Sequence, residues 1–314
     1  MTREALAFAV LLAAAPASAS SSSPWSEKAY GVLLVGPDGG HDWGAFSGQV
    51  KKRLGPDVPV ESFAGPLETK SLQKAVDKLS AARARKICVV PVFPYTASME
   101  LAQLRYTLGL EKLPSRAFLE AWGMTRRVVA RVKTKAALVL AAPLGADEAA
   151  SAVLLERALE KRRRGKAETV LLLGTGAETD DENAARLADL EAHAKRLGAS
   201  KDLAGTRVWL LRPNTKDKPR QRAESEKALQ VLVAGLTRAG PVVVVPYLLT
   251  QDGTQRAWRR VLENPFLRWQ DKGLLPSERL ARWAAARAAA ARGEADQVRF
   301  KDAGQALPPE ERKR

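Results

Sequence analysis

Short apolar segments alternate with longer amphipathic segments along the chain, and this alternation constrains the fold more than any other feature. Residues 30–36 (YGVLLVG) and 168–174 (ETVLLLG) are apolar runs with the length of one strand buried on both faces. Between such runs, apolar residues recur three and four positions apart, as they do over 72–79, which is the spacing of one helix face. No hairpin signal joins the runs. We therefore predict an α/β fold with mainly parallel sheets.

The two halves of the chain resemble each other. LLVG at 33–36 has a counterpart in LLLG at 171–174, and VVPVF at 89–93 has one in VVPYL at 244–248. We therefore predict two similar lobes with a cleft between them. In open α/β sheets, ligands bind beyond the carboxyl ends of the strands. Strands are expected at 30–36, 58–63, 86–93, 136–143, 168–174, 206–211 and 241–249.

Composition excludes several classes of protein. The chain has 314 residues, enough for about two domains, and 46% of them are hydrophobic, which is sufficient for a packed core. Cys88 is the single cysteine, so an intrachain disulfide framework and a multi-cysteine metal site are excluded. Only two histidines are present, which excludes a histidine-rich metal cage.

The two ends of the chain differ from its middle. Residues 1–19 have the short apolar core and the Ala-Ser-Ala ending of a secretory signal peptide, so we expect export to the periplasm or the extracellular space. Residues 20–28 would form a leader, and no later segment reaches the length of a membrane span. Residues 276–292 have a narrow apolar stripe at helical spacing and predict a helix. Residues 293–314 are charged and predict a disordered tail.

The loop after the first strand contains the first candidate site residues. His41 and Asp42 are adjacent there, and histidine is both a common metal ligand and a general acid or base. The alternative is an ordinary helix start with Asp42 in the first turn. His193 lies with Arg186 and Asp189 on the polar face of a helix, and we expect it to be exposed to solvent.

The loop after the fifth strand allows two interpretations. Gly174-x-Gly176 after a strand is part of a dinucleotide-binding pattern, but the third glycine is missing and the following acidic residues would repel a pyrophosphate. Thr179 and Glu182 have the spacing of a helix capping box, which we favour.

Six stretches of sequence together resemble a known family. The chain resembles the class II sirohydrochlorin chelatases, the cobalt- and iron-inserting enzymes of tetrapyrrole biosynthesis, and in particular a two-lobed, exported branch. The resemblance implies an N-terminal lobe at 29–110, a connection at 111–135 and a C-terminal lobe at 136–275, with metal and macrocycle between the lobes. It is carried by 31–46 (GVLLVGPDGGHDWGAF), 71–79, 86–110, 168–197, 242–249 and 273–283.

The sequence departs from the family pattern where the metal ligands are expected. Pro37, Ala97, Thr175 and Thr254 occupy the places nearest to the histidines of the family, and Glu68 is the one carboxylate near the expected position. Insertion of Co²⁺ or Fe²⁺ needs neutral imidazole ligands and an acceptor for the pyrrole protons, and proline or alanine can supply neither. His41 and Asp42 are then the candidate metal and catalytic residues of a weaker, substitute site.

Two functional hypotheses follow from the resemblance and its departures. The first is an exported chelatase-like protein that binds a tetrapyrrole or a divalent metal without efficient insertion. The alternative is an active, divergent chelatase for which Co²⁺ or Fe²⁺ is the substrate metal. The missing histidines and the export signal favour the first hypothesis, because sirohydrochlorin is made in the cytoplasm.

The net charge of +16 suggests an acidic partner, and one basic loop is a candidate for binding it. No nucleic-acid recognition motif is present, so we expect no nucleic-acid partner. Most basic runs fit solvated faces or helix C-termini. The loop 212–222 follows the carboxyl end of a strand, where it could pair with the carboxylates of a macrocycle. The predicted substrate-binding residues are Arg212, Lys216, Lys218, Arg220, Arg222, Thr175 and Thr254.

Overall fold

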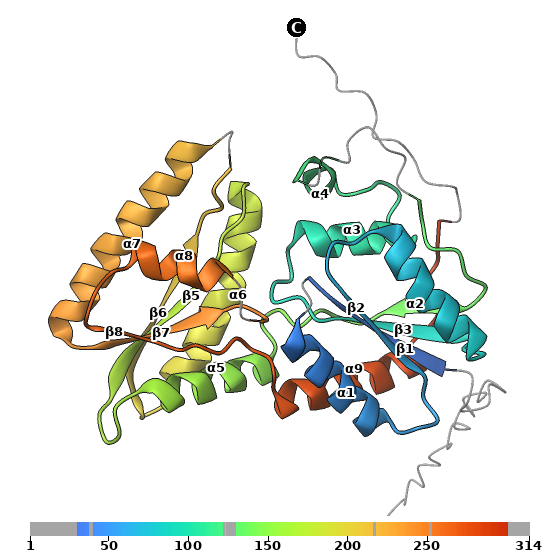
Figure 1. Ribbon diagram of the computed structural model, residues 1–314, viewed down its shortest axis with the longest axis horizontal. Coiled ribbons are helices and arrows are strands. Elements are labelled where there is room, and N and C mark those ends of the chain that lie inside the picture. Colours follow the sequence, from blue (N-terminus) through green and yellow to red (C-terminus); the bar gives the residue numbers. More distant parts are fainter. Residues whose placement is uncertain are drawn as a thin grey trace, which may run out of the picture.

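Two parallel sheets form the centre of the molecule. The computed structural model describes residues 30–37, 40–121, 123, 130–215, 218–250 and 253–300. Each sheet has four strands, in the orders β2-β1-β3-β4 and β6-β5-β7-β8, and every adjacent pair is parallel. Figure 1 shows the two lobes side by side, each with helices on both faces of its sheet. The predicted α/β fold with two similar lobes and mainly parallel sheets is confirmed.

The first sheet and its flanking helices are built from the first part of the chain. The strands are β1 (Tyr30–Gly36), β2 (Val60–Ala64), β3 (Lys86–Pro91) and β4 (Ala137–Leu140). The helices are α1 (His41–Leu54), α2 (Thr69–Ala81), α3 (Met99–Thr107) and α4 (Arg116–Ala121). All seven residues of β1 are buried, because helices cover both faces of this sheet.

The second sheet has the same strand order and also includes a short strand that was not expected. Its strands are β5 (Glu168–Thr175), β6 (Leu203–Leu211), β7 (Val242–Tyr247) and β8 (Leu267–Trp269). The remaining helices are α5 (Glu148–Lys161), α6 (Asp180–Gly198), α7 (Pro219–Ala239), α8 (Gly253–Val261) and α9 (Glu278–Gly293). The three residues of β8 lack a strand-like alternation of their own and depend on pairing with β7.

The predicted boundary at residue 136 places β4 in the wrong lobe. β4 pairs with β3, with Ile87 opposite Leu138 and Val89 opposite Leu140, so it completes the first sheet. Leu138 and Val139 are fully buried there. The physical reason is that pairing with the neighbouring parallel strand buries this apolar run at once, so the crossover to the second lobe comes after β4.

The lobes exchange the helix that follows the fourth strand of each. Helix α5 follows β4 but packs against α6 and β7 of the second lobe, whereas α9 follows β8 but packs against α1 and β3 of the first lobe. Figure 1 shows both helices on the same side of the molecule, one under each sheet. The predicted C-terminal helix is present, and its apolar stripe, including Leu280 and Trp283, is buried. One continuous hydrophobic cluster therefore spans both lobes.

The first part of the predicted tail is ordered. Residues 294–300 lie beside the edge strand β4, where the Gln297 amide donates to the Leu138 carbonyl at 3.2 Å. The Phe300 amide donates to the Gly109 carbonyl at 2.7 Å. The prediction of a disordered tail from residue 293 is therefore wrong for 294–300, because an unpaired strand edge offers hydrogen bonds to a passing chain.

Some predictions lie outside the described residues. These are the signal peptide at 1–19, the leader at 20–28 and the tail from 301 to 314. Within the described ranges, no helix is both long and apolar enough to cross a membrane.

Candidate functional site

The carboxyl ends of the central strands of the two sheets meet where the lobes join. Tyr95, which follows β3, stacks edge-on against Tyr247 at the end of β7, with ring centroids 5.2 Å apart. The backbone N–H and the hydroxyl of Thr96 both donate to Asp189 Oδ2, at 2.7 and 2.8 Å. Since ligands of open α/β sheets bind at this edge of the strands, the junction is the candidate functional site.

His193, on α6, lies at the centre of this junction and is fully buried. Its Nδ1 is 2.7 Å from Ser151 Oγ, and its Nε2 is 3.1 Å from the Gly145 carbonyl oxygen and 3.0 Å from the Tyr247 hydroxyl. A carbonyl can only accept, so Nε2 carries the proton and Nδ1 accepts from the Ser151 hydroxyl. Burial lowers the pKa of His193 to about 4; Arg196 acts in the same direction, while the Gly145 carbonyl and Asp147 oppose the change. The imidazole is therefore neutral at physiological pH.

The prediction that His193 is exposed is wrong. The face of α6 that carries Arg186, Asp189 and His193 packs on the loops of the first lobe, and all three residues are buried. A polar stripe at helical spacing is compatible both with water and with a polar protein surface, so the pattern does not separate the two cases. The signal that could have found the site is the combination of three ionisable types on one stripe of a helix that follows a strand's carboxyl end.

Gly174, near the end of β5, and Gly176, just after it, allow close packing. A Cβ on Gly174 would lie 2.3 Å from the Tyr95 hydroxyl oxygen, so only glycine lets this ring approach from the other lobe. The favoured interpretation of the following residues is partly confirmed: Thr179 Oγ1 accepts from the Glu182 amide at 3.3 Å and caps α6. In a full capping box the Glu182 carboxylate would also accept from the Thr179 amide. Here this carboxylate pairs with Arg186 instead, at 2.6 Å.

Arg186 and Tyr95 join the same network. The Arg186 guanidinium lies over the Tyr95 ring, 5.0 Å from its centroid, and donates to the Gly176 carbonyl at 3.2 Å. Burial raises the pKa of Tyr95 to about 12, although Arg186 acts in the opposite direction. Burial also raises the pKa of Tyr247 well above its usual value. Both phenols therefore stay protonated at neutral pH and can donate hydrogen bonds.

The predicted substitute metal site lies at the start of α1. His41 is the first residue of this helix, and its side chain lies outside the described residues. Asp42 is half-buried in the first turn. Within the part of the chain that the structure describes, no group of three or more His, Cys, Asp or Glu side chains could hold a metal ion. The pairing of His41 with Asp42 stays a prediction.

The four places where family histidines were expected lie in two loops, at the end of strand β5 and in one helix. Pro37 directly follows β1, and Ala97 precedes Ser98, whose hydroxyl caps α3 by accepting from the Leu101 amide at 3.1 Å. Glu68 is the N-cap residue of α2 and makes no side-chain cap bond. Thr254 lies in α8.

The basic loop after β6 is held by contacts of its own. Arg212 donates to the Ala177 carbonyl at 2.8 Å and pairs with Asp180 at 2.6 Å. Arg222 pairs with Glu226 at 2.6 Å and donates to the Arg212 carbonyl at 2.7 Å. The structure thus brings Arg212 and Arg222 together, but on the side of β6, which is the edge strand of its sheet.

The other predicted residues of this loop are less enclosed. Lys218 Nζ donates to the Glu178 carbonyl at 2.9 Å. Arg220 is exposed on the first turn of α7, and Lys216 lies outside the described residues. Thr175 ends β5, where its carbonyl accepts from Arg186 at 3.4 Å.

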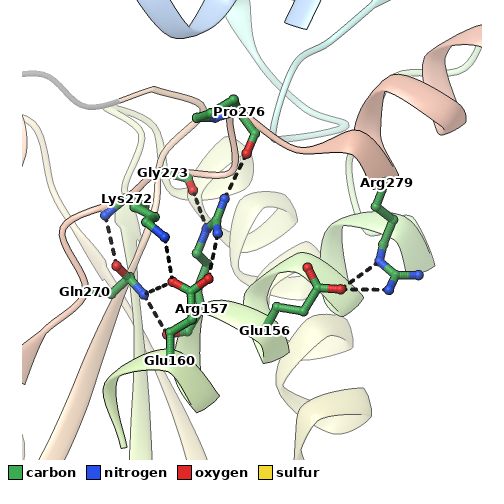
Figure 2. Close-up of polar contacts among 8 residues, drawn as sticks. All are labelled: Glu156, Arg157, Glu160, Gln270, Lys272, Gly273, Pro276 and Arg279. Atoms are coloured by element: carbon green, nitrogen blue, oxygen red, sulfur yellow. Dashed lines mark hydrogen bonds and ion pairs between the residues drawn. The ribbon is translucent and has the colours of Figure 1, made fainter. Parts of the chain in front are cut away.

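A polar clamp fixes the segment that returns from the second sheet to the first lobe. Figure 2 shows Arg157 of α5 pointing at this segment, where it donates to the Gly273 carbonyl at 3.1 Å and to the Pro276 carbonyl at 2.9 Å. Gln270 donates to the Arg157 carbonyl at 2.7 Å. Arg279, at the start of α9, pairs with Glu156 at 2.7 Å. The clamp ties the crossover to α5 and so sets the relative position of the lobes.

Comparisons with known proteins agree with this architecture. The model of the CbiX family matches residues 37–161. SirB from Bacillus subtilis, solved with Fe³⁺, is 16% identical with a TM-score of 0.57, over 86% of this chain and 99% of that chain. The sirohydrochlorin chelatase SirB from Bacillus subtilis subspecies spizizenii, in complex with cobalt, is 17% identical with a TM-score of 0.55 and the same coverage. No curated protein matches the sequence.

A third similar structure is larger. DR2241 from Deinococcus radiodurans, a multi-domain protein with structural similarity to chelatases, is 18% identical with a TM-score of 0.50. The match covers 88% of this chain and 57% of that protein. The CbiX match lies in the first lobe and the crossover helix, while the likeness in fold spans both lobes. The chain therefore has a chelatase-like fold, and part of it matches the CbiX family.

Proposed function

We propose that the protein binds an acidic tetrapyrrole or a divalent metal between its lobes and does not insert the metal efficiently. The observation that carries the second part of this proposal, the lack of efficient insertion, is the state of His193. Both of its ring nitrogens are engaged by protein groups, at 2.7 Å to Ser151 and 3.1 Å to Gly145. A metal ligand needs a free lone pair, and the Nδ1 lone pair accepts the Ser151 hydroxyl.

The groups around His193 also lack the proton acceptors and metal ligands that metal insertion requires. Insertion requires an acceptor for two pyrrole protons as well as an open metal site. Tyr95 and Tyr247 have raised pKa values, so they are protonated and do not act as bases or as phenolate ligands near neutral pH. Asp189 is the nearby carboxylate, and its Oδ2 accepts two hydrogen bonds from Thr96.

Exposed cations near the carboxyl edge of the second sheet could bind an acidic ligand. Lys218 and Arg220 are exposed there, and we propose that they pair with the carboxylates of the macrocycle, together with Lys216 and the hydroxyls of Thr175 and Thr254. In this proposal Arg212 and Arg222 act mainly by holding the loop in place, because their guanidinium groups already bind Asp180 and Glu226.

The second candidate function is an active, divergent chelatase that uses His41 and Asp42. The observation that favours it is that the CbiX match starts at residue 37 and includes both residues. Co²⁺ or Fe²⁺ would then be the substrate metal, with the imidazole as ligand and the carboxylate as proton acceptor.

We also propose that the protein acts outside the cytoplasm, which rests on the signal-like residues 1–19.

A visible-spectrum assay separates the two candidates. The chain from Ser20 is mixed with sirohydrochlorin, first alone and then with Co²⁺. We expect a spectral shift with the macrocycle alone and, after metal addition, an insertion rate equal to that without protein. Faster insertion that is lost in His41→Ala but kept in Lys51→Ala, a change at an exposed position of the same helix, would establish the divergent chelatase instead.

A further inference from the structure

The amino ends of the four strands of the second sheet lie in one row. Glu168 is opposite Leu203, Thr169 is opposite Val242, and Val242 is opposite Leu267. The loops that precede these strands are therefore neighbours. We call this set the outer edge, and it consists of residues 162–167, 199–202, 238–241 and 262–266. Figure 1 shows it at the end of the second lobe that faces away from the first.

The outer edge has an excess of positive charge that the protein does not neutralise. It contains six basic and two acidic side chains. Arg162 pairs with Asp202 at 2.7 Å, and Arg162 Nη1 also donates to the Lys166 carbonyl at 3.3 Å, which closes the turn. The other five cations are exposed and form no ion pair within the described part of the chain. They are Arg163, Arg164, Lys166, Lys201 and Arg238.

An aromatic ring projects from the same edge. Phe266 is 57% exposed and is one of five exposed large apolar side chains in the described part of the chain. Its backbone is fixed on both sides: its amide donates to Asn264 Oδ1 at 2.9 Å, and its carbonyl accepts from the Val242 amide at 3.1 Å. Pro265 beside it is also exposed. The ring is therefore held at the surface by a rigid loop.

Helix dipoles explain only part of this arrangement. Arg238 lies in the last turn of α7, where a cation is favoured. Arg163, Arg164 and Lys166 lie beyond the C-cap residue of α5, and Lys201 lies beyond that of α6, where the dipole effect has faded. Dipoles also give no reason for an exposed phenylalanine.

At the corresponding edge of the first sheet, one cation is covered by the returning chain. Lys86, at the start of β3, is partnered by Asp296 at 3.4 Å and by the Glu294 carbonyl of the returning chain. Arg83 and Lys135 are exposed at this edge of the first sheet, so it also carries cations. The outer edge of the second lobe differs in combining its five exposed cations with the exposed ring of Phe266.

We propose that the outer edge binds the surface of a membrane that contains anionic lipid. The five unpaired cations would contact lipid phosphates, and Phe266 with Pro265 would enter the boundary between headgroups and acyl chains. A nucleic-acid duplex offers phosphates but no apolar layer that could bury Pro265 and Phe266. The combination of exposed cations with these apolar side chains therefore favours lipid.

Vesicle binding tests this proposal directly. The chain from Ser20 is sedimented with vesicles of phosphatidylcholine, with and without phosphatidylglycerol. We expect binding only to the vesicles with phosphatidylglycerol, and weaker binding at higher salt. The triple variant R163Q/R164Q/K166Q should bind roughly 100-fold more weakly, from about a fivefold loss for each cation removed near an anionic surface. Phe266→Ala should bind about tenfold more weakly.

A matched triple variant controls for total charge. K51Q/K52Q/K74Q removes three exposed lysines from α1 and α2 of the first lobe and should bind the vesicles as the unsubstituted chain does. Circular dichroism of each variant verifies that the fold is kept. Equal losses in the two triples, equal binding to both kinds of vesicle, or binding to a DNA duplex without binding to vesicles would each overturn the proposal.

Discussion

The helices α1 and α6 occupy the same place in their lobes but meet different surroundings. Each follows the first strand of its sheet. Helix α1 packs on α9 and buries Trp43, Phe46 and Val50. Helix α6 buries Leu190 and Leu197 on one side, and its polar stripe lies against the first lobe. The charged side chains and the imidazole of the junction thus come from the second lobe.

The first lobe and the crossover supply a different kind of partner. Pro94 and Gly145 contribute backbone carbonyls, both of which accept from the Tyr247 hydroxyl. Tyr95 contributes a ring and Thr96 contributes two donors. The comparison teaches that a shared topology fixes which loops meet, whereas the side chains on one helix decide what chemistry is present there.

The largest effect is expected from Gly36, which ends β1, and from Gly174, the second-last residue of β5. A Cβ on Gly174 would lie 2.3 Å from Tyr95 of the other lobe, and a Cβ on Gly36 would lie 2.6 Å from the Trp43 ring of its own lobe. Each substitution by alanine should lower the free energy of unfolding by about 3 kcal/mol in urea titrations. Only Gly174→Ala should also change the radius of gyration measured by small-angle scattering.

A control for this pair is available on α1. Gly48 has no atom within 4 Å of an added Cβ, so Gly48→Ala should leave stability unchanged or raise it by roughly 0.5–1 kcal/mol. If Gly174→Ala and Gly36→Ala give the same scattering profile, Tyr95 does not couple the lobes in the way the contact predicts.

The next effect is a loss of stability in acid that depends on His193. Its pKa falls from 6.5 to about 4 on folding, so the unfolded chain binds more protons between these values. The contribution is complete above about pH 6.5 and is lost as the pH falls toward 4, by roughly 3 kcal/mol in all. Urea unfolding at a series of pH values measures this slope.

His193→Gln tests the assignment of that slope. Glutamine keeps an amide donor for the Gly145 carbonyl but does not titrate, so the variant should be less stable at pH 7 and its stability should change less between pH 6.5 and 4. A variant with the same slope as the unsubstituted chain would show that other groups cause the acid loss.

The fold could be predicted from the sequence because apolar runs must be covered. The strands β1, β3, β5 and β7 are buried along nearly their whole length, and their composition alone indicates a sheet with helices on both faces. The position of β4 could not be predicted, since its apolar run fits either sheet. The exchange of α5 and α9 likewise depends on packing between lobes, which no local pattern encodes.

The candidate site was only partly visible in the sequence. The rule that ligands bind at the carboxyl ends of strands indicated loops that do meet at the junction, and Tyr95 and Thr96 follow the strand predicted at 86–93. His193 was missed because helical spacing shows which residues share a face but not what covers it. The partners of Arg212 were missed for a similar reason: Asp180 lies 32 residues away in sequence and approaches only once β5 and β6 pair.

The smallest effect on stability is expected from the hydrogen bonds between Asp189 and Thr96 at the junction. Asp189 Oδ2 accepts two hydrogen bonds from Thr96, and Asp189→Asn would replace a charged acceptor with a neutral one of the same shape. We expect a loss of about 1–2 kcal/mol in the free energy of unfolding, because bonds to a charged group are stronger than neutral ones. Glu191→Gln, at an exposed position on the same helix, should change stability by less than about 0.5 kcal/mol. If both variants behave alike, the hydrogen bonds to Thr96 add nothing to the docking of the lobes, and the aromatic contact between Tyr95 and Tyr247 would then hold the junction.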